Sequence, residues 1–216
     1  MIRSIIQVED SSRPYLASSP TNGLKTEQEN WISNYPNDNL YGDTHYYNYF
    51  SDPLNWKNHP NSRFVSEYGY QSYPSLQTLS LITNVSQLTY PINNVIEHHQ
   101  HLVGGTSKLE NLISTHFNLP AHGSVERFND LIYLSQIIQA LGVKSQTEFY
   151  RRNRQVNQFT GEGYTMGALY WMLNDIWPAP TWSSIEFGGK WKMLHYYAKK
   201  MFDNLLVSPY EDNGII

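Results

Sequence analysis

Arg63-Phe-Val-Ser-Glu-Tyr-Gly-Tyr-Gln71 is the stretch of this sequence that decides its fold. Phe64-Val-Ser66 forms a strand-like approach to Glu67, and Gly69 follows where such a strand would end. If this strand belongs to a parallel barrel, Glu67 lies near its C-terminal end, where barrel enzymes hold their catalytic groups. The chemistry of the stretch alone leaves two interpretations equally open, a buried structural glutamate or a catalytic carboxylate.

Similar short runs of apolar, aromatic and small residues predict further buried strands, and helical patterns lie between or after them. The strongest helical pattern begins at Ser124, a suitable N-cap, and brings Phe128, Leu131 and Ile138 to one face. Strands that alternate with helices predict βα units and an α/β fold with a parallel sheet. The predicted strands are 13–18, 43–50, 63–68 and 168–173, and the predicted helices are 75–82, 107–115, 124–148 and 190–204.

The composition is that of a globular protein with one sizeable core. The chain has 216 residues, of which 40% are apolar and 16% charged, and its formal net charge is −4. No overall basic character points to nucleic acid or an anionic membrane as a partner. No apolar stretch is long enough to span a bilayer, and no secretory signal is visible at the N-terminus. Because the chain has no cysteine, disulfides and thiolate chemistry are excluded.

Aromatic residues are unusually frequent, with 17 Tyr, 8 Phe and 6 Trp. The face of an aromatic ring suits the C–H bonds of a sugar. Any single ring in such a chain more often fills the core, so this composition permits a carbohydrate-binding function without requiring one.

Several motifs occur along the chain in a fixed order. They are Arg13-Pro-Tyr-Leu-Ala-Ser-Ser-Pro-Thr-Asn-Gly23, Gly42-Asp-Thr-His-Tyr-Tyr47, Ser66-Glu-Tyr-Gly-Tyr-Gln-Ser72, Met166-Gly-Ala-Leu-Tyr-Trp-Met-Leu-Asn-Asp-Ile-Trp177 and Gly188-Gly-Lys-Trp-Lys-Met-Leu-His-Tyr196. Together they resemble the β-mannosidases of glycoside hydrolase family 2. The resemblance implies a (β/α)8 TIM barrel, of which residues 1–205 would form the C-terminal half, strands five to eight. Residues 206–216 would be a tail that leads out of the barrel.

In this resemblance, Glu67 corresponds to the catalytic nucleophile. Retaining glycosidases use two carboxyl groups about 5 Å apart, one as nucleophile and the other as acid and base. The acid/base glutamate of the family follows an asparagine on the fourth barrel strand, which would precede residue 1. Glu29-Asn30 has the reverse order, so we expect the second carboxylate to be absent from this chain.

The resemblance also implies residues that bind the substrate. His45 and Tyr47 correspond to residues that support the nucleophile and the sugar by hydrogen bonding. Trp171 corresponds to the tryptophan that floors the sugar-binding subsite, with Asn174 and Asp175 beside it at the mouth of the barrel. Without the resemblance, a lone histidine in an aromatic segment is more often structural.

Histidines cluster at His98-His-Gln-His101, but a fourth ligand with metal-site spacing is not evident. We therefore expect no metal, and we expect no cofactor because two carboxylates suffice for glycoside hydrolysis. Asn84-Val-Ser86 is a glycosylation sequon, which has meaning only if the complete protein enters the secretory pathway.

The expected function is that of a retaining exo-β-mannosidase, which removes terminal β-linked mannose from oligosaccharides of glycoproteins, and the family implies the lysosome. The expected partners are this oligosaccharide and the missing N-terminal half of the barrel, with neither nucleic acid nor a membrane. Two alternatives stay open. One is a truncated, non-catalytic sugar-binding or relic protein, and the other is a different family 2 activity such as β-galactosidase or β-glucuronidase.

Overall fold

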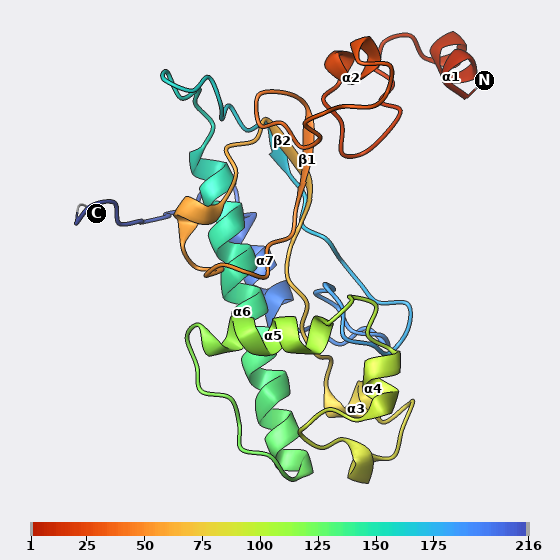
Figure 1. The fold of residues 1–216 in the computed structure, drawn as a ribbon, viewed down its shortest axis with the longest axis vertical. Coiled ribbons are helices and arrows are strands. Elements are labelled where there is room, and N and C mark those ends of the chain that lie inside the picture. Colours follow the sequence, from red (N-terminus) through yellow and green to blue (C-terminus); the bar gives the residue numbers. More distant parts are fainter. Residues whose placement is uncertain (1, 215–216) are drawn as a thin grey trace. The chain divides into compact units, whose positions relative to one another are not determined.

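The structure is a computed structural model that describes residues 2–214, and these residues form two compact units (Figure 1). Of the described residues, the first unit contains 2–46, Pro60–Glu67 and Asn153–Leu169, and the second contains Tyr47–His59, Tyr68–Arg152 and 170–214. The elements in chain order are α1 (Ile2–Glu9), α2 (Leu24–Gln28), β1 (Asp43–Tyr46), η1 (Trp56–Asn58), β2 (Phe64–Tyr68), α3 (Leu76–Leu79), η2 (Val85–Gln87), α4 (Asn94–His98), α5 (Gly105–Ser114), α6 (Val125–Arg152), β3 (Gly167–Ala168) and α7 (Met193–Met201).

A small sheet organises the first unit. Among the described residues, β1, β2 and β3 form one sheet in that order, and β2 runs parallel to β3 with Phe64 opposite Gly167. A Cβ atom on Gly167 would lie 2.3 Å from a ring carbon of Phe64. The sheet therefore needs glycine at this position, because any larger residue would displace the Phe64 ring.

The predicted strand at residues 13–18 is wrong, since this segment is irregular in the structure. Its side chains are exposed except for the half-buried Tyr15. Pairing with the sheet begins later, at Thr21, whose backbone exchanges two hydrogen bonds with that of Asp43, with N···O distances of 3.1 and 2.8 Å. An extended apolar run becomes a strand only where a neighbouring strand accepts its hydrogen bonds, and residues 13–18 have none in the described part of the chain.

The long helix α6 organises the second unit, and Phe128, Leu131 and Ile138 on one of its faces are completely buried. It packs against α5 and α7. Gln139 connects the helix to two other segments, because its Nε2 donates to Tyr70 O at 2.9 Å and to Ser183 O at 3.3 Å. The helical periodicity of the sequence thus predicted this helix and its buried face, although the helix extends to Arg152, past the predicted end.

A buried lysine lies close to this helix. Lys192 precedes α7, is completely buried and donates from Nζ to Ser72 O at 3.3 Å and to Thr181 O at 3.4 Å. Burial lowers the pKa of Lys192 to about 8, while the nearby carboxylates of Asp175 and Glu186 act in the opposite direction. Lys192 is therefore the counter-charge of two acidic side chains inside the second unit.

The predicted α/β class is confirmed by the sheet and helices, whereas the barrel itself stays a prediction. The predicted boundary at residue 205 also stays a prediction. Beyond that position, Tyr210 packs edge to face on Trp56 with ring centroids 5.3 Å apart, and Trp56 Nε1 donates to Glu211 O at 3.0 Å. No helix in the described part of the chain is long and apolar enough to cross a membrane.

We expect Lys192→Met to lower the free energy of unfolding of the complete protein by about 1.5–3 kcal/mol, because the hydrogen bonds from its ammonium group to Ser72 O and Thr181 O are lost. The matched control is Lys190→Met, since the exposed Lys190 only binds Gln77 Oε1 at 2.7 Å. That control should stay within about 0.5 kcal/mol of the unmodified protein. Chemical denaturation measures both values, and equal stabilities of the two variants would contradict the prediction.

The same residue predicts a dependence of stability on pH. The pKa of Lys192 falls from 10.5 to about 8 on folding, so the unfolded state binds more protons between these values. Stability contributed by this group therefore increases as the pH rises from about 8 towards 10.5. This increase should be absent from Lys192→Met.

Candidate active site

Glu67 lies near the C-terminal end of β2, as the sequence predicted. Its side chain is 30% exposed, so the carboxylate reaches solvent while the strand beneath it is held in the sheet. Val65, two positions earlier on the same strand, is completely buried and its carbonyl oxygen accepts from Leu169 N at 2.8 Å, just past β3. Glu67 is thus a solvent-accessible carboxylate on a strand that is held in the sheet.

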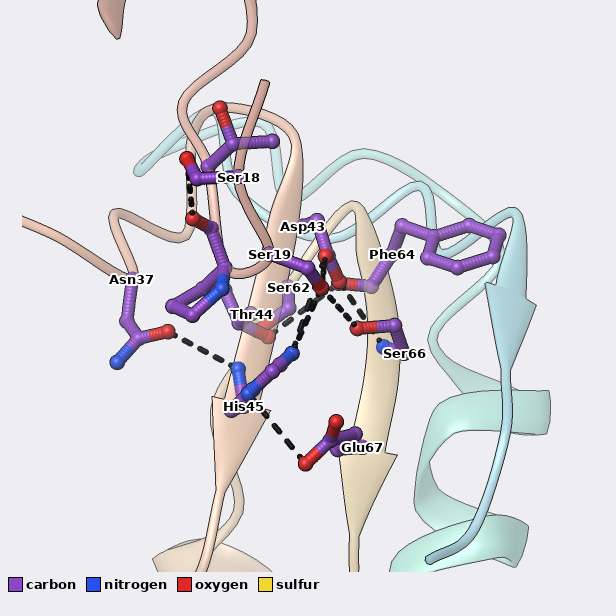
Figure 2. A network of polar contacts seen from close by, with 12 residues as sticks. Ser18, Ser19, Asn37, Asp43, Thr44, His45, Ser62, Phe64, Ser66 and Glu67 are labelled. Carbon is purple, nitrogen blue, oxygen red and sulfur yellow. Dashed lines mark hydrogen bonds and ion pairs between the residues drawn. The ribbon is translucent and has the colours of Figure 1, made fainter. Parts of the chain in front are cut away.

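His45, on the neighbouring strand β1, faces this carboxylate. Its Nδ1 lies 3.5 Å from Glu67 Oε2, and its Nε2 lies 2.8 Å from Ser19 Oγ (Figure 2). The backbone N of His45 donates to Asn37 Oδ1 at 2.9 Å, which holds this edge of β1. The structure therefore brings together two of the predicted site residues, Glu67 and His45.

The sequence analysis did not single out Asp43 and Ser19, which complete this network. Asp43 is buried and accepts from Ser66 N at 3.1 Å through Oδ1, and Ser19 Oγ donates to its Oδ2. Figure 2 shows the Ser19 hydroxyl at the centre of Asp43, His45 and Ser66. A signal was present in the sequence, because residues two positions apart on a strand, such as Asp43 and His45, point to the same face.

Thr44, between Asp43 and His45, is buried, and its side chain forms its contacts on the opposite face of β1. Its Oγ1 donates to Ser62 Oγ at 2.8 Å and lies 3.3 Å from Phe64 O. The alternation of the strand thus separates two functions: one face of β1 carries the polar network with Glu67, and the other attaches the strand to the start of β2.

The other predicted residues belong to the second unit. The ring of Tyr47 packs edge to face on Trp182, with centroids 6.0 Å apart, and the Trp171 side chain is 43% exposed. Asn174 is exposed. In contrast, Asp175 is buried, and its two carboxylate oxygens accept from Thr181 Oγ1 at 2.6 Å and Ser183 Oγ at 2.7 Å. Asp175 thus stabilises the loop that contains Asn174 through these two hydrogen bonds.

The histidine cluster forms structural contacts. His99 Nδ1 lies 3.0 Å from Pro178 O, and the His101 ring stacks on Trp177 with centroids 4.8 Å apart. Among residues 2–214, no group of three or more His, Asp or Glu side chains is arranged to hold a metal ion.

Comparisons with known proteins identify similar sequences and a similar structure. The chain is 50% identical to the β-mannosidases of Capra hircus and Bos taurus over its whole length, and it spans 24% of each of them. The β-D-mannosidase of Dictyoglomus thermophilum superposes on 99% of the chain with a TM-score of 0.81 and 30% identity, again over 24% of that protein. No family model matches the chain.

The similarity to these enzymes places the chain among the glycoside hydrolases. Within that class, the chain belongs to the β-mannosidases of glycoside hydrolase family 2. It spans about a quarter of the length of the relatives that it matches.

Proposed function

We propose that this chain is the nucleophile-bearing C-terminal half, strands five to eight, of the (β/α)8 barrel of a retaining exo-β-mannosidase. The complete protein would act in the lysosome and hydrolyse terminal β-linked mannose from oligosaccharides of glycoproteins. The observation that carries the proposal is the pair of Glu67 and His45 on neighbouring strands, 3.5 Å apart, in a chain that is 50% identical to a mammalian β-mannosidase.

In the proposed reaction, the Glu67 carboxylate attacks the anomeric carbon while the bond to the leaving oxygen breaks. An acid/base carboxyl group outside this chain protonates that oxygen, and a covalent glycosyl-enzyme forms. The same group then takes a proton from water, whose oxygen attacks the anomeric carbon and releases Glu67. The two carboxyl groups complete this cycle, so the proposal includes neither a metal nor a cofactor.

Support for the half-barrel comes from the order of the elements. β2 and β3 are parallel neighbours, and helices follow each of them along the chain, α3 to α6 after β2 and α7 after β3. This is the pattern of βα units in a barrel. The remaining strands, and the acid/base glutamate, would come from the N-terminal part of the complete protein.

The proposal assigns sugar binding to residues of the second unit. Trp171 would floor the subsite with its exposed ring, and Tyr47 and Asn174 would contribute hydrogen bonds. Because both oxygens of Asp175 already accept hydroxyl groups, its proposed contribution is to hold the loop beside Trp171 in place.

Glu67→Gln in the complete protein should lower kcat/KM for a β-mannoside by at least about 10⁴-fold, because the amide keeps the size but is a far weaker nucleophile. A mannosyl inhibitor that traps the intermediate should label the peptide containing Glu67. The control is Glu162→Gln. In the unmodified protein, the Glu162 carboxylate accepts hydrogen bonds from Asn39 Nδ2 at 3.4 Å and from Asn61 Nδ2 at 3.3 Å. Labelling at Glu162 or Asp175 would overturn the assignment of Glu67.

Trp171→Ala should weaken mannoside binding and turnover while leaving the protein folded. Burial of a large apolar side chain contributes about 1.5–3 kcal/mol, so kcat/KM should fall by about 10- to 100-fold. The matched control is Trp191→Ala, since Trp191 has a similar exposure, 42% against 43%. Near-normal kinetics of Trp171→Ala would remove Trp171 from the proposed subsite.

The isolated 216-residue chain should not hydrolyse an unactivated β-mannoside, because a poor leaving group departs very slowly without a proton donor. Half a barrel also leaves open strand edges, so no sharp unfolding of a monomer is expected. Turnover is measured on the purified chain and on its Glu67→Gln variant, which reveals contaminating activity. An aryl mannoside with a good leaving group is the stricter substrate, and turnover of the unactivated mannoside by the purified chain alone would contradict the half-barrel.

A further inference from the structure

We propose that Asp43 and Ser19 are positioning residues that set the protonation of His45, so that His45 faces Glu67 as a cation. The inference deepens the proposed function and rests on it, because Glu67 is taken as the nucleophile. The contacts run from a buried carboxylate, through one hydroxyl group and one imidazole ring, to Glu67 (Figure 2).

The buried carboxylate of Asp43 sets the direction of the first hydrogen bond. An ionised carboxylate only accepts hydrogen bonds, and Asp43 accepts from Ser66 N at 3.1 Å and from the hydroxyl group of Ser19. A hydroxyl group has a single proton. Ser19 therefore donates its single hydroxyl proton to Asp43, and Ser19 Oγ can only accept hydrogen bonds from its other neighbours.

The direction of the next bond follows from this. His45 Nε2 lies 2.8 Å from Ser19 Oγ, and Ser66 Oγ lies 3.2 Å from the same atom. Both groups must donate, since Ser19 has no second proton to give. His45 thus carries a proton on Nε2 for as long as Asp43 is ionised and this bond is intact.

The other ring nitrogen of His45 then determines the contact with the nucleophile. In a neutral histidine with its proton on Nε2, Nδ1 has only a lone pair. Nδ1 lies 3.5 Å from Glu67 Oε2, and a lone pair facing a carboxylate oxygen is repulsive. One proton between these two atoms removes the repulsion, and it resides on His45 whenever Glu67 is the attacking carboxylate.

The charges around the ring are consistent with a cation. Asp43 Oδ2 lies 3.9 Å from Nε2 on one side of His45, and the Glu67 carboxylate lies beside Nδ1 on the other. Opposite charges at these distances attract each other. A cationic His45 therefore holds the Glu67 carboxylate, the group that attacks the anomeric carbon, in position.

Asp43→Asn in the complete protein tests the role of the buried charge. The amide of this variant can donate to Ser19, whose proton then turns to His45 Nε2 and leaves a neutral ring with its proton on Nδ1. The single-turnover release of dinitrophenolate from 2,4-dinitrophenyl β-mannoside measures formation of the glycosyl-enzyme. This rate should fall about tenfold, the loss expected when the cation beside the Glu67 carboxylate becomes a neutral imidazole. The substrate Kd from the same experiment should change less than about threefold, because neither Asp43 nor Ser19 is assigned to the sugar.

Ser19 provides the second test and the control. Ser19→Ala should also slow glycosyl-enzyme formation without weakening Kd, and Ser19→Thr, which keeps the hydroxyl group, should restore most of the rate. Ser18→Ala is the matched control, because the Ser18 hydroxyl donates to Pro20 O at 3.1 Å. Its rate should equal that of the unmodified protein, and the melting temperatures of all variants show whether they are folded.

A double-mutant cycle shows whether the two residues act through His45. In a His45→Ala background, Asp43→Asn and Ser19→Ala should cause no further loss of rate, because the group that they position is gone. Equal losses with and without His45, or unchanged rates in both single variants, would overturn the inference. A different result would contradict the proposed function, namely full activity of Glu67→Gln. The two failures are therefore distinguishable.

Discussion

The buried carboxylate of Asp43 is the contact on which the first unit of this chain depends. Its backbone pairs with Thr21, and its side chain accepts from the backbone of Ser66 on β2 and from Ser19. Two segments that are distant in the sequence, residues 19–21 and β2, are thereby attached to a single residue of β1. A buried carboxylate without partners would be strongly unfavourable, so the burial of Asp43 requires these segments to keep their positions. The surroundings of Glu67 follow from that requirement.

The second unit uses a buried carboxylate in a different way. Asp175 accepts two hydroxyl groups from its own loop, and Lys192 provides the opposite charge in the interior. The first unit offers its carboxylate only hydrogen-bond donors without a fixed charge, whereas the second includes a lysine with a lowered pKa. The imidazole of His45 is the group between Asp43 and Glu67 that can provide a positive charge there.

Sequence patterns predicted the elements with strong local signals. The periodicity of Phe128, Leu131 and Ile138 predicted α6, and the apolar run before Glu67 predicted β2. The same reasoning was wrong for residues 13–18, because a strand depends on a neighbour that the local sequence does not specify. It also left out α1, an amphipathic helix of which no residue is buried in the described part of the chain. Local patterns therefore predict the type of an element better than its pairing.

The sequence by itself determined which chemistry the chain can carry: a glutamate at the end of a strand, a histidine on another strand, and aromatic rings whose faces suit a sugar. Only the tertiary structure decided which of these groups meet and with what proton arrangement. Strand pairing brings residues between positions 19 and 67 into contact, so that Ser19, Asp43, His45 and Glu67 form one network. The direction of each hydrogen bond then depends on which neighbour has a proton to donate, a property of the assembled network that no single segment possesses.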